Sequence, residues 1–106
     1  MVTQVRGLHL QSIQVSAVTI EVAFGRGIPG VFIIGLAGDS IRESKERVKS
    51  SILHSGLKFP TRKIVINLAP AGEKKNGSML DLPIAVGVII EAEKIAVPAL
   101  ERLVFV

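Results

Sequence analysis

Residues 64–90 constrain the fold most, because they join a buried strand to a helix through a polar loop. Residues 64–69 are apolar and rich in β-branched side chains, which predicts a covered strand. Proline, glycine and asparagine residues between positions 70 and 78 end that strand in a loop. The run Asp81-Leu82-Pro83 predicts a helix start, with Asp81 as a structural cap and Pro83 in the first turn. Loops in such a place often hold functional residues, so the chemistry open to this loop is the first functional question.

Three strands are predicted ahead of this segment. Residues 8–11 alternate between leucine and polar side chains, which indicates a strand with His9 on a wet face. Residues 18–24 show the same alternation more clearly. Residues 31–34 are continuously apolar, which predicts a central strand covered on both faces.

A helix is predicted from about residue 40 to residue 55. Ser40 and Glu43 have the spacing of a capping box, and Asp39 adds negative charge at the same helix start. Gly56 stands where a C-terminal glycine belongs. The predicted inward stripe consists of small and apolar side chains: Ile41, Ser44, Val48, Ser51 and Ile52.

The second helix, residues 81–94, is apolar nearly all round, so we expect both of its sides to be covered. The element order is therefore β-β-β-α-β-α, in one α+β domain over residues 1–106 with a mixed sheet. Residues 103–106 resemble the start of a further strand, so we expect a chain that is cut at its C-terminus. A content of 48% hydrophobic residues is enough for a real core.

Composition excludes several kinds of site. The chain has no cysteine, so disulfides and thiolate metal sites are excluded. His9 and His54 each stand alone and are interpreted as exposed histidines, so no metal site is predicted. We see no signal peptide, and the longest apolar run is far short of the ~20 residues of a membrane span. We therefore expect a cytoplasmic location and no membrane partner.

Two glycine patterns mimic nucleotide-binding motifs. Residues 25–30 match G-x-G-x-x-G, but the match contains Pro29 and leads into a strand, so a glycine-rich hairpin turn is the better interpretation. Residues 30–35 have the glycine spacing of a P-loop, but Leu36 and Ala37 replace the lysine and hydroxyl that such a loop needs.

Positive charge is concentrated between Asp39 and Lys63. Seven basic and three acidic residues there account for the formal net charge of the whole chain, +4. Arg42, Lys45 and Lys49 lie at helical spacing and can share a face that neutralises phosphates. A solvated helix face with weak ion pairs would give the same pattern, and no aromatic residue is expected beside the cluster to stack on a base.

Four segments together resemble a known family. Residues 28–36 contain Ile-Pro-Gly and Ile-Gly-Leu, and residues 42–48 read Arg-Glu-Ser-Lys-Glu-Arg-Val. Residues 63–70 read Lys-Ile-Val-Ile-Asn-Leu-Ala-Pro, and residues 81–85 read Asp-Leu-Pro-Ile-Ala. In this order they resemble the N-terminal domain of the magnesium-chelatase-like AAA+ ATPases of the YifB/ComM type. The resemblance covers nearly the whole chain.

The resemblance implies a fold like that of the Lon proteolytic domain, shared with a small-subunit ribosomal protein. It also implies an AAA+ module in the same chain that binds ATP and magnesium, self-association of the parent protein, and a link to competence and DNA recombination. None of the ATP-binding motifs is present here, so no cofactor is expected in this fragment. The family name does not imply insertion of a metal into a porphyrin.

The likeness to Lon proteases allows one comparison at the loop. Lon-type proteases carry a nucleophilic serine at this junction, and the resemblance places Met79 at that position. A thioether has no proton to lose and cannot attack a carbonyl, so no catalytic residue is predicted. Ser78 is adjacent, but a shift of one residue at a helix start turns a side chain by about 100°.

These observations predict a non-catalytic accessory domain that serves assembly, nucleic-acid guidance or both. The candidate contacts to nucleic acid are basic residues: Arg42, Lys45 and Lys49 first, then Arg62 and Lys63, then Lys74 and Lys75 in the loop. The alternatives are a protein-interaction domain without DNA affinity and, last, a Lon-type serine hydrolase.

Overall fold

The computed structural model describes residues 2–11, 14–36, 38–70 and 78–106. The described residues form strands β1 (Val2–Gln11), β2 (Gln14–Gly25), β3 (Gly30–Ile34) and β4 (Lys63–Ala69), together with helices α1 (Gly38–His54) and α2 (Asp81–Glu93). A short 3₁₀ helix, η1 (Leu100–Arg102), follows α2. The predicted order of strands and helices is confirmed.

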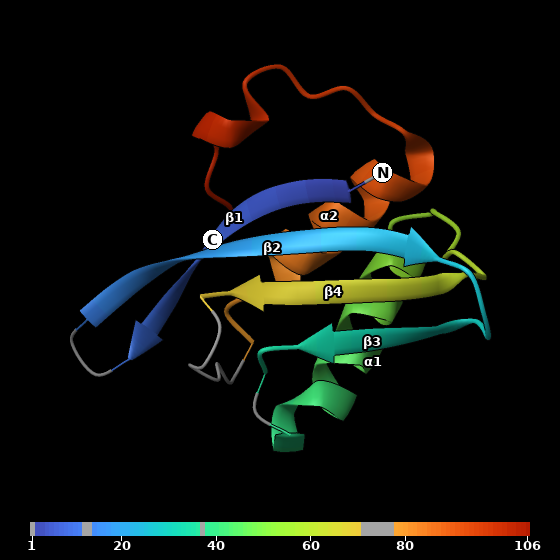
Figure 1. The fold of residues 1–106 in the computed structure, drawn as a ribbon, viewed down its shortest axis with the longest axis horizontal. Coiled ribbons are helices and arrows are strands. Elements are labelled where there is room, and N and C mark those ends of the chain that lie inside the picture. Colours follow the sequence, from blue (N-terminus) through green and yellow to red (C-terminus); the bar gives the residue numbers. More distant parts are fainter. Residues whose placement is uncertain (1, 12–13, 37, 71–77) are drawn as a thin grey trace.

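The strands form one mixed sheet in the order β1-β2-β4-β3. β1 and β2 pair antiparallel, as do β2 and β4, whereas β3 and β4 pair parallel. Figure 1 shows both helices behind the sheet, with α2 crossing behind β1 and β2. The connection from β3 through α1 to β4 is a β-α-β unit, which is what parallel neighbours require. The predicted α+β class with a mixed sheet is therefore confirmed.

The core lies between the sheet and the helices. Every second residue of the two central strands faces it, so that Val22 on β2 lies opposite Ile66 on β4. α2 approaches the sheet closely at Gly87, where a Cβ atom would lie 2.8 Å from Val22 Cγ2. This close contact explains a glycine inside an otherwise apolar helix.

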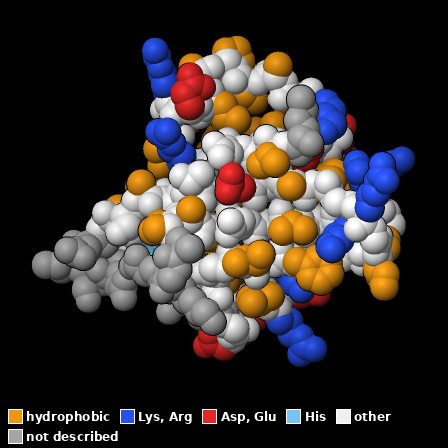
Figure 2. Space-filling model, viewed as in Figure 1, with side chains coloured by type: hydrophobic (Ala, Val, Ile, Leu, Met, Phe, Trp, Pro, Cys, Tyr) orange, Lys and Arg blue, Asp and Glu red, His pale blue; other side chains and the backbone are white. Residues whose placement is uncertain are grey.

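β3 is an edge strand, so the prediction of a central strand covered on both faces is wrong. Its Ile33 faces the core, but Phe32 and Ile34 are 48% and 57% exposed on the other face of the sheet. Figure 2 shows hydrophobic side chains gathered over β3 and β4 on this open face. The prediction of a hairpin turn at residues 25–30 also fails, because β4 lies between β2 and β3.

The side chains of β1 face the core and the solvent in the opposite way to the prediction. His9 is buried on the helix side at 6% exposure, whereas Leu10 is 49% exposed. The pairing of β1 with β2 sets this phase, since Val5 and Gly7 lie opposite the core residues Ile20 and Val18. His9 follows them on the same face, so its interpretation as an exposed histidine is wrong.

α1 begins earlier than its capping-box pattern predicts. The helix starts at Gly38, so Ser40 lies inside the first turn and is not the cap, while Asp39 does supply the predicted acidic charge there. The predicted C-terminus is confirmed: Gly56 has φ +82, its N–H bonds to the carbonyl of Leu53, and Leu57 N–H bonds to that of Ile52. The buried residues of α1 are Ser44, Val48 and Ile52. Ser51, which was expected on the same inward stripe, is exposed.

Asp81 is not a helix cap. Leu80 occupies the N-cap position of α2, which makes no side-chain capping hydrogen bond, and Asp81 is the first helical residue. Its carboxylate instead accepts hydrogen bonds from two α1 side chains, Ser44 (3.0 Å) and Arg47. Pro83 has no N–H to be capped, so the carboxylate is free to link the two helices.

The coverage of α2 is only partly as predicted. The helix contacts β1 and β2 on one side and α1 on another, yet Leu82 remains 49% exposed. The further strand predicted at residues 103–106 is a single parallel bridge, in which Phe105 N–H donates to the Arg6 carbonyl at 2.9 Å. Within the described residues, no helix is long and apolar enough to cross a membrane.

Candidate nucleic-acid interface

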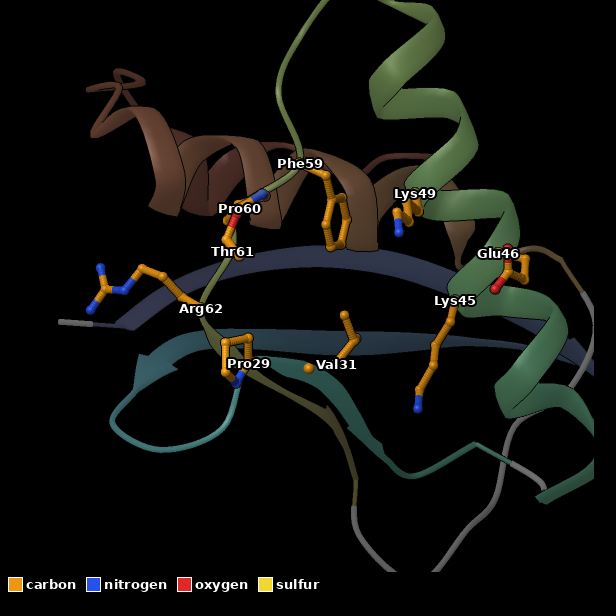
Figure 3. A pocket seen from close by; sticks show the side chains of 10 residues that line it. Pro29, Val31, Lys45, Glu46, Lys49, Phe59, Pro60, Thr61 and Arg62 are labelled. Carbon is orange, nitrogen blue, oxygen red and sulfur yellow. The ribbon is translucent and has the colours of Figure 1, made fainter.

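A hollow of about 390 Å³ opens at the β3 edge of the sheet, between α1 and the segment that leads into β4 (Figure 3). Its lining comes from three parts of the chain: Lys45, Glu46 and Lys49 on α1, residues 59–62 ahead of β4, and residues 29–31 at the start of β3. The Gly30 N–H bonds to the Arg62 carbonyl at 3.2 Å, which ties the last two parts together. We refer to this feature below as the β3-edge hollow.

Three of the predicted contact residues meet at the β3-edge hollow: Lys45, Lys49 and Arg62. Lys45 and Lys49 are one turn apart on α1, and Figure 3 shows Lys45 extending from α1 toward β3. The guanidinium of Arg62 points away from the hollow in the same view, so only its stem contributes to the wall.

Aromatic rings accompany the basic residues, so the expectation of a patch without an aromatic neighbour is wrong. Lys49 Nζ lies 5.8 Å from the centroid of the Phe59 ring, which itself lines the hollow. Arg62 lies over Phe24 at 5.0 Å, and Lys63 over Phe32 at 5.5 Å. None of these pairs is close in the sequence. The pairing of β4 with β2 and β3 brings the start of β4 near Phe24 and Phe32, which the sequence alone did not predict.

Two other predicted residues, Arg42 and Lys63, lie outside the hollow. Arg42 is exposed on α1, one turn before Lys45. Lys63 begins β4 and projects toward Phe32 on the open face of the sheet. Lys74 and Lys75 fall outside the described residues.

Charge at the β3-edge hollow is positive. Two lysines, Lys45 and Lys49, and one carboxylate, Glu46, line it, which leaves a net charge of +1 among the described lining residues when Arg62, whose guanidinium points away, is not counted. Arg47 belongs to the same basic segment but is engaged elsewhere, with Asp81 and with Glu43 at 3.6 Å. The hydrogen bond to Asp81 is the main cause that raises the pKa of Arg47. Arg47 thus serves helix packing and is unavailable as a free surface cation.

The loop-to-helix junction carries structural contacts. Met79 Sδ accepts a hydrogen bond from the Leu10 N–H at 3.4 Å, and the Ser78 carbonyl accepts one from the Asp81 N–H at 3.1 Å. Met79 therefore ties the start of α2 to β1. His54 is exposed, as predicted, and its Nδ1 lies 2.8 Å from the Ser50 carbonyl. The described residues hold no cluster of three or more metal-ligating side chains.

Sequence reasoning missed one buried carboxylate. Glu91 on α2 is 3% exposed, accepts a hydrogen bond from Thr3 at 2.6 Å and pairs with Lys94 at 2.8 Å. Burial alone would raise the pKa of Glu91, but the hydrogen bonds from Lys94 and Thr3 outweigh it and hold the pKa below its ordinary value. A glutamate that ends an apolar run, three residues before a lysine, was the available signal.

Comparison with known proteins identifies a family. A family model described as subunit ChlI of Mg-chelatase matches residues 20–106. The chain is 44% identical over 84 residues to the uncharacterized protein YifB of Salmonella typhimurium and 36% identical over 94 residues to the competence protein ComM of Haemophilus influenzae. It is 31% identical over 90 residues to the uncharacterized protein Rv2897c of Mycobacterium tuberculosis.

These alignments cover 79%, 89% and 85% of this chain, but only 17%, 18% and 17% of the respective relatives. The chain therefore spans less than a fifth of the length of these relatives.

Proposed function

This chain belongs to the family of the ChlI subunit of Mg-chelatase, and we propose that it is a non-catalytic accessory domain that guides nucleic acid for a larger ATPase. In this proposal ATP and magnesium are bound by an AAA+ module of the same parent chain, and the parent protein self-associates in the cytoplasm. The name of the ComM relative, a competence protein, supports a role in competence, and we extend the proposal to DNA recombination.

The observation that carries the proposal is that Lys45 and Lys49 of α1 meet Phe59, from the segment before β4, at one hollow. A solvated helix face would need only the α1 residues, whereas here an aromatic ring and the stem of one further basic residue, Arg62, from the segment before β4 lie beside them. Lysine and arginine side chains that neutralise phosphates release counterions, which makes binding strong at low salt and weak at high salt. The proposed contact surface consists of Lys45, Lys49, Arg62 and Arg42, and Lys63 is left out because it lies over Phe32 on the open face of the sheet.

Titration of labelled single-stranded and forked DNA with the 106-residue chain at several salt concentrations tests the proposal. We expect binding at low salt that weakens steeply as salt rises, and a clear loss of affinity in Arg42→Ala/Lys45→Ala. The matched control is Arg6→Ala/Arg102→Ala, which removes the same charge from β1 and η1. Absence of binding at low salt, or equal affinity of the two double variants, would remove the proposal.

The second candidate is a protein-interaction domain without DNA affinity. The observation that favours it is the open face of the sheet. On this face the β3 side chains Phe32 and Ile34, next to β4, are each about half exposed, and exposed apolar patches often mark protein interfaces. Analytical ultracentrifugation separates the two candidates, because stable self-association in a chain that binds no DNA favours assembly alone.

The non-catalytic part of the proposal rests on Met79, whose sulfur is engaged by the Leu10 N–H. We expect no cleavage when the chain is incubated with casein, since a thioether cannot attack a carbonyl. Ser78→Ala is the control variant. Cleavage that disappears in this variant would restore a Lon-type hydrolase.

A further inference from the structure

We propose that the β3-edge hollow receives one unpaired base of a single-stranded nucleic acid, with the Phe59 ring against the base. Lys45 and Lys49 contact the phosphates that flank it. This inference rests on the proposed function and names the form of nucleic acid that the site selects.

The hollow has the size and walls of a ligand site. Its volume, about 390 Å³, lies within the roughly 300–1,000 Å³ of small-ligand pockets. Apolar side chains form much of its lining, namely Pro29, Val31, Phe59 and Pro60. Phosphate recognition alone needs no apolar walls, so these side chains indicate a ligand with an uncharged, flat or apolar part.

The cations are placed around the apolar walls. Lys45 and Lys49 are four residues apart, which separates them by about 6 Å along the helix axis. The amine of Lys49 also lies over the Phe59 ring, a contact that fixes the ring beside the hollow. Arg42 carries positive charge on α1 beyond the hollow, so a further phosphate of a strand can be met outside it.

This arrangement favours a single strand over other acidic partners. A base inside a duplex is stacked on both sides and cannot reach an aromatic side chain, whereas an unpaired base can. An acidic peptide would neutralise the lysines, but its carboxylates have no ring to place against Phe59. The site therefore discriminates by the base as well as by the phosphates.

Phe59→Leu is the variant that isolates the base, since it removes the ring and keeps an apolar side chain. Stacking of one base on an aromatic ring is worth about 1–3 kcal/mol, so affinity for a labelled 15-nucleotide oligo-dT should fall by roughly 5- to 150-fold. Affinity for a 15-base-pair duplex should not change. Phe32→Leu is the matched control, because Phe32 also lies beneath a lysine but on the opposite face of the sheet.

A second measurement needs no variant. The unmodified chain should bind an abasic strand of equal length more weakly than oligo-dT, by the same factor of roughly 5 to 150. In a competition experiment, polyglutamate at equal charge should displace oligo-dT poorly. Equal affinity for the abasic strand, equal losses in Phe59→Leu and Phe32→Leu, or efficient displacement by polyglutamate would each overturn the inference. Failure of the proposed function looks different, because the unmodified chain would then bind neither single strand nor duplex at low salt.

Discussion

At the residue scale, the most unusual group is the buried carboxylate of Glu91. A carboxylate removed from water is stable only when hydrogen bonds replace its hydration, and Thr3 and Lys94 supply them. The three residues join β1 to the C-terminal end of α2. Glu91 therefore contributes to stability through its charge, and that contribution depends on pH.

The pKa of Glu91 is lowered in the folded chain, below the ordinary value of about 4.3. Its contribution to stability is therefore complete above that ordinary value and is lost as pH falls through the folded pKa. We expect Glu91→Gln to lower the free energy of unfolding by roughly 1–3 kcal/mol at pH 7 and by less at pH 3, because the carboxyl of the unfolded chain is then protonated. Urea unfolding at the two pH values measures this.

The exposed neighbour Glu93 provides the control. Glu93→Gln should have little effect at either pH. A deficit of Glu91→Gln that is the same at pH 3 and pH 7 would mean that the charge of this carboxylate does not contribute.

At the element scale, the link between α1 and α2 passes through Asp81. Asparagine caps helices as well as aspartate does, so a capping role would leave Asp81→Asn as stable as the unmodified chain. The observed ion pair with Arg47 predicts instead a loss of about 1 kcal/mol, because both side chains remain partly exposed. The loss should shrink at high salt, and urea unfolding in low and high salt checks it. An unchanged Asp81→Asn variant would contradict the ion-pair account.

Helix α2 also makes a prediction through Gly87. Alanine normally stabilises a helix interior by up to about 1 kcal/mol relative to glycine. Here the added methyl would meet Val22 Cγ2 at 2.8 Å, so Gly87→Ala should destabilise by roughly 1–3 kcal/mol. Gly38→Ala on α1 is the control, since a Cβ there meets nothing within 4 Å. A stabilised Gly87→Ala would show that α2 does not lie this close to β2.

Local signals predicted the elements, whereas distant contacts decided what their residues do. Gly56 follows α1 as its pattern predicted. The left-handed backbone conformation at this position depends on the residue itself and not on distant contacts. The apolar run of β3 fits a central strand and an edge strand equally well, and only its pairing with β4 places it at the edge. The partner of Asp81 is 34 residues away, and Phe59 reaches Lys49 only after the chain reverses at Gly56.

At the scale of the whole chain, the two faces of the sheet differ. One face is covered by α1 and α2, and the other presents Phe32 and Ile34 beside Val65 of β4. We expect Phe32→Ser/Ile34→Ser to weaken any self-association seen by sedimentation and to leave DNA affinity unchanged, because these side chains lie on the other face from the β3-edge hollow. Loss of DNA binding in this variant would show that the open face takes part in it.

The phosphate contacts of α1 can be counted from the slope of log affinity against log salt concentration for a single-stranded DNA. Each phosphate contact contributes about 0.7 to that slope, so Lys45→Gln/Lys49→Gln should reduce its magnitude by roughly 1.4. Arg6→Gln/Arg102→Gln, with the same loss of charge far from the β3-edge hollow, should leave the slope unchanged. Equal slopes for all three proteins would contradict the assignment of nucleic-acid contacts to α1.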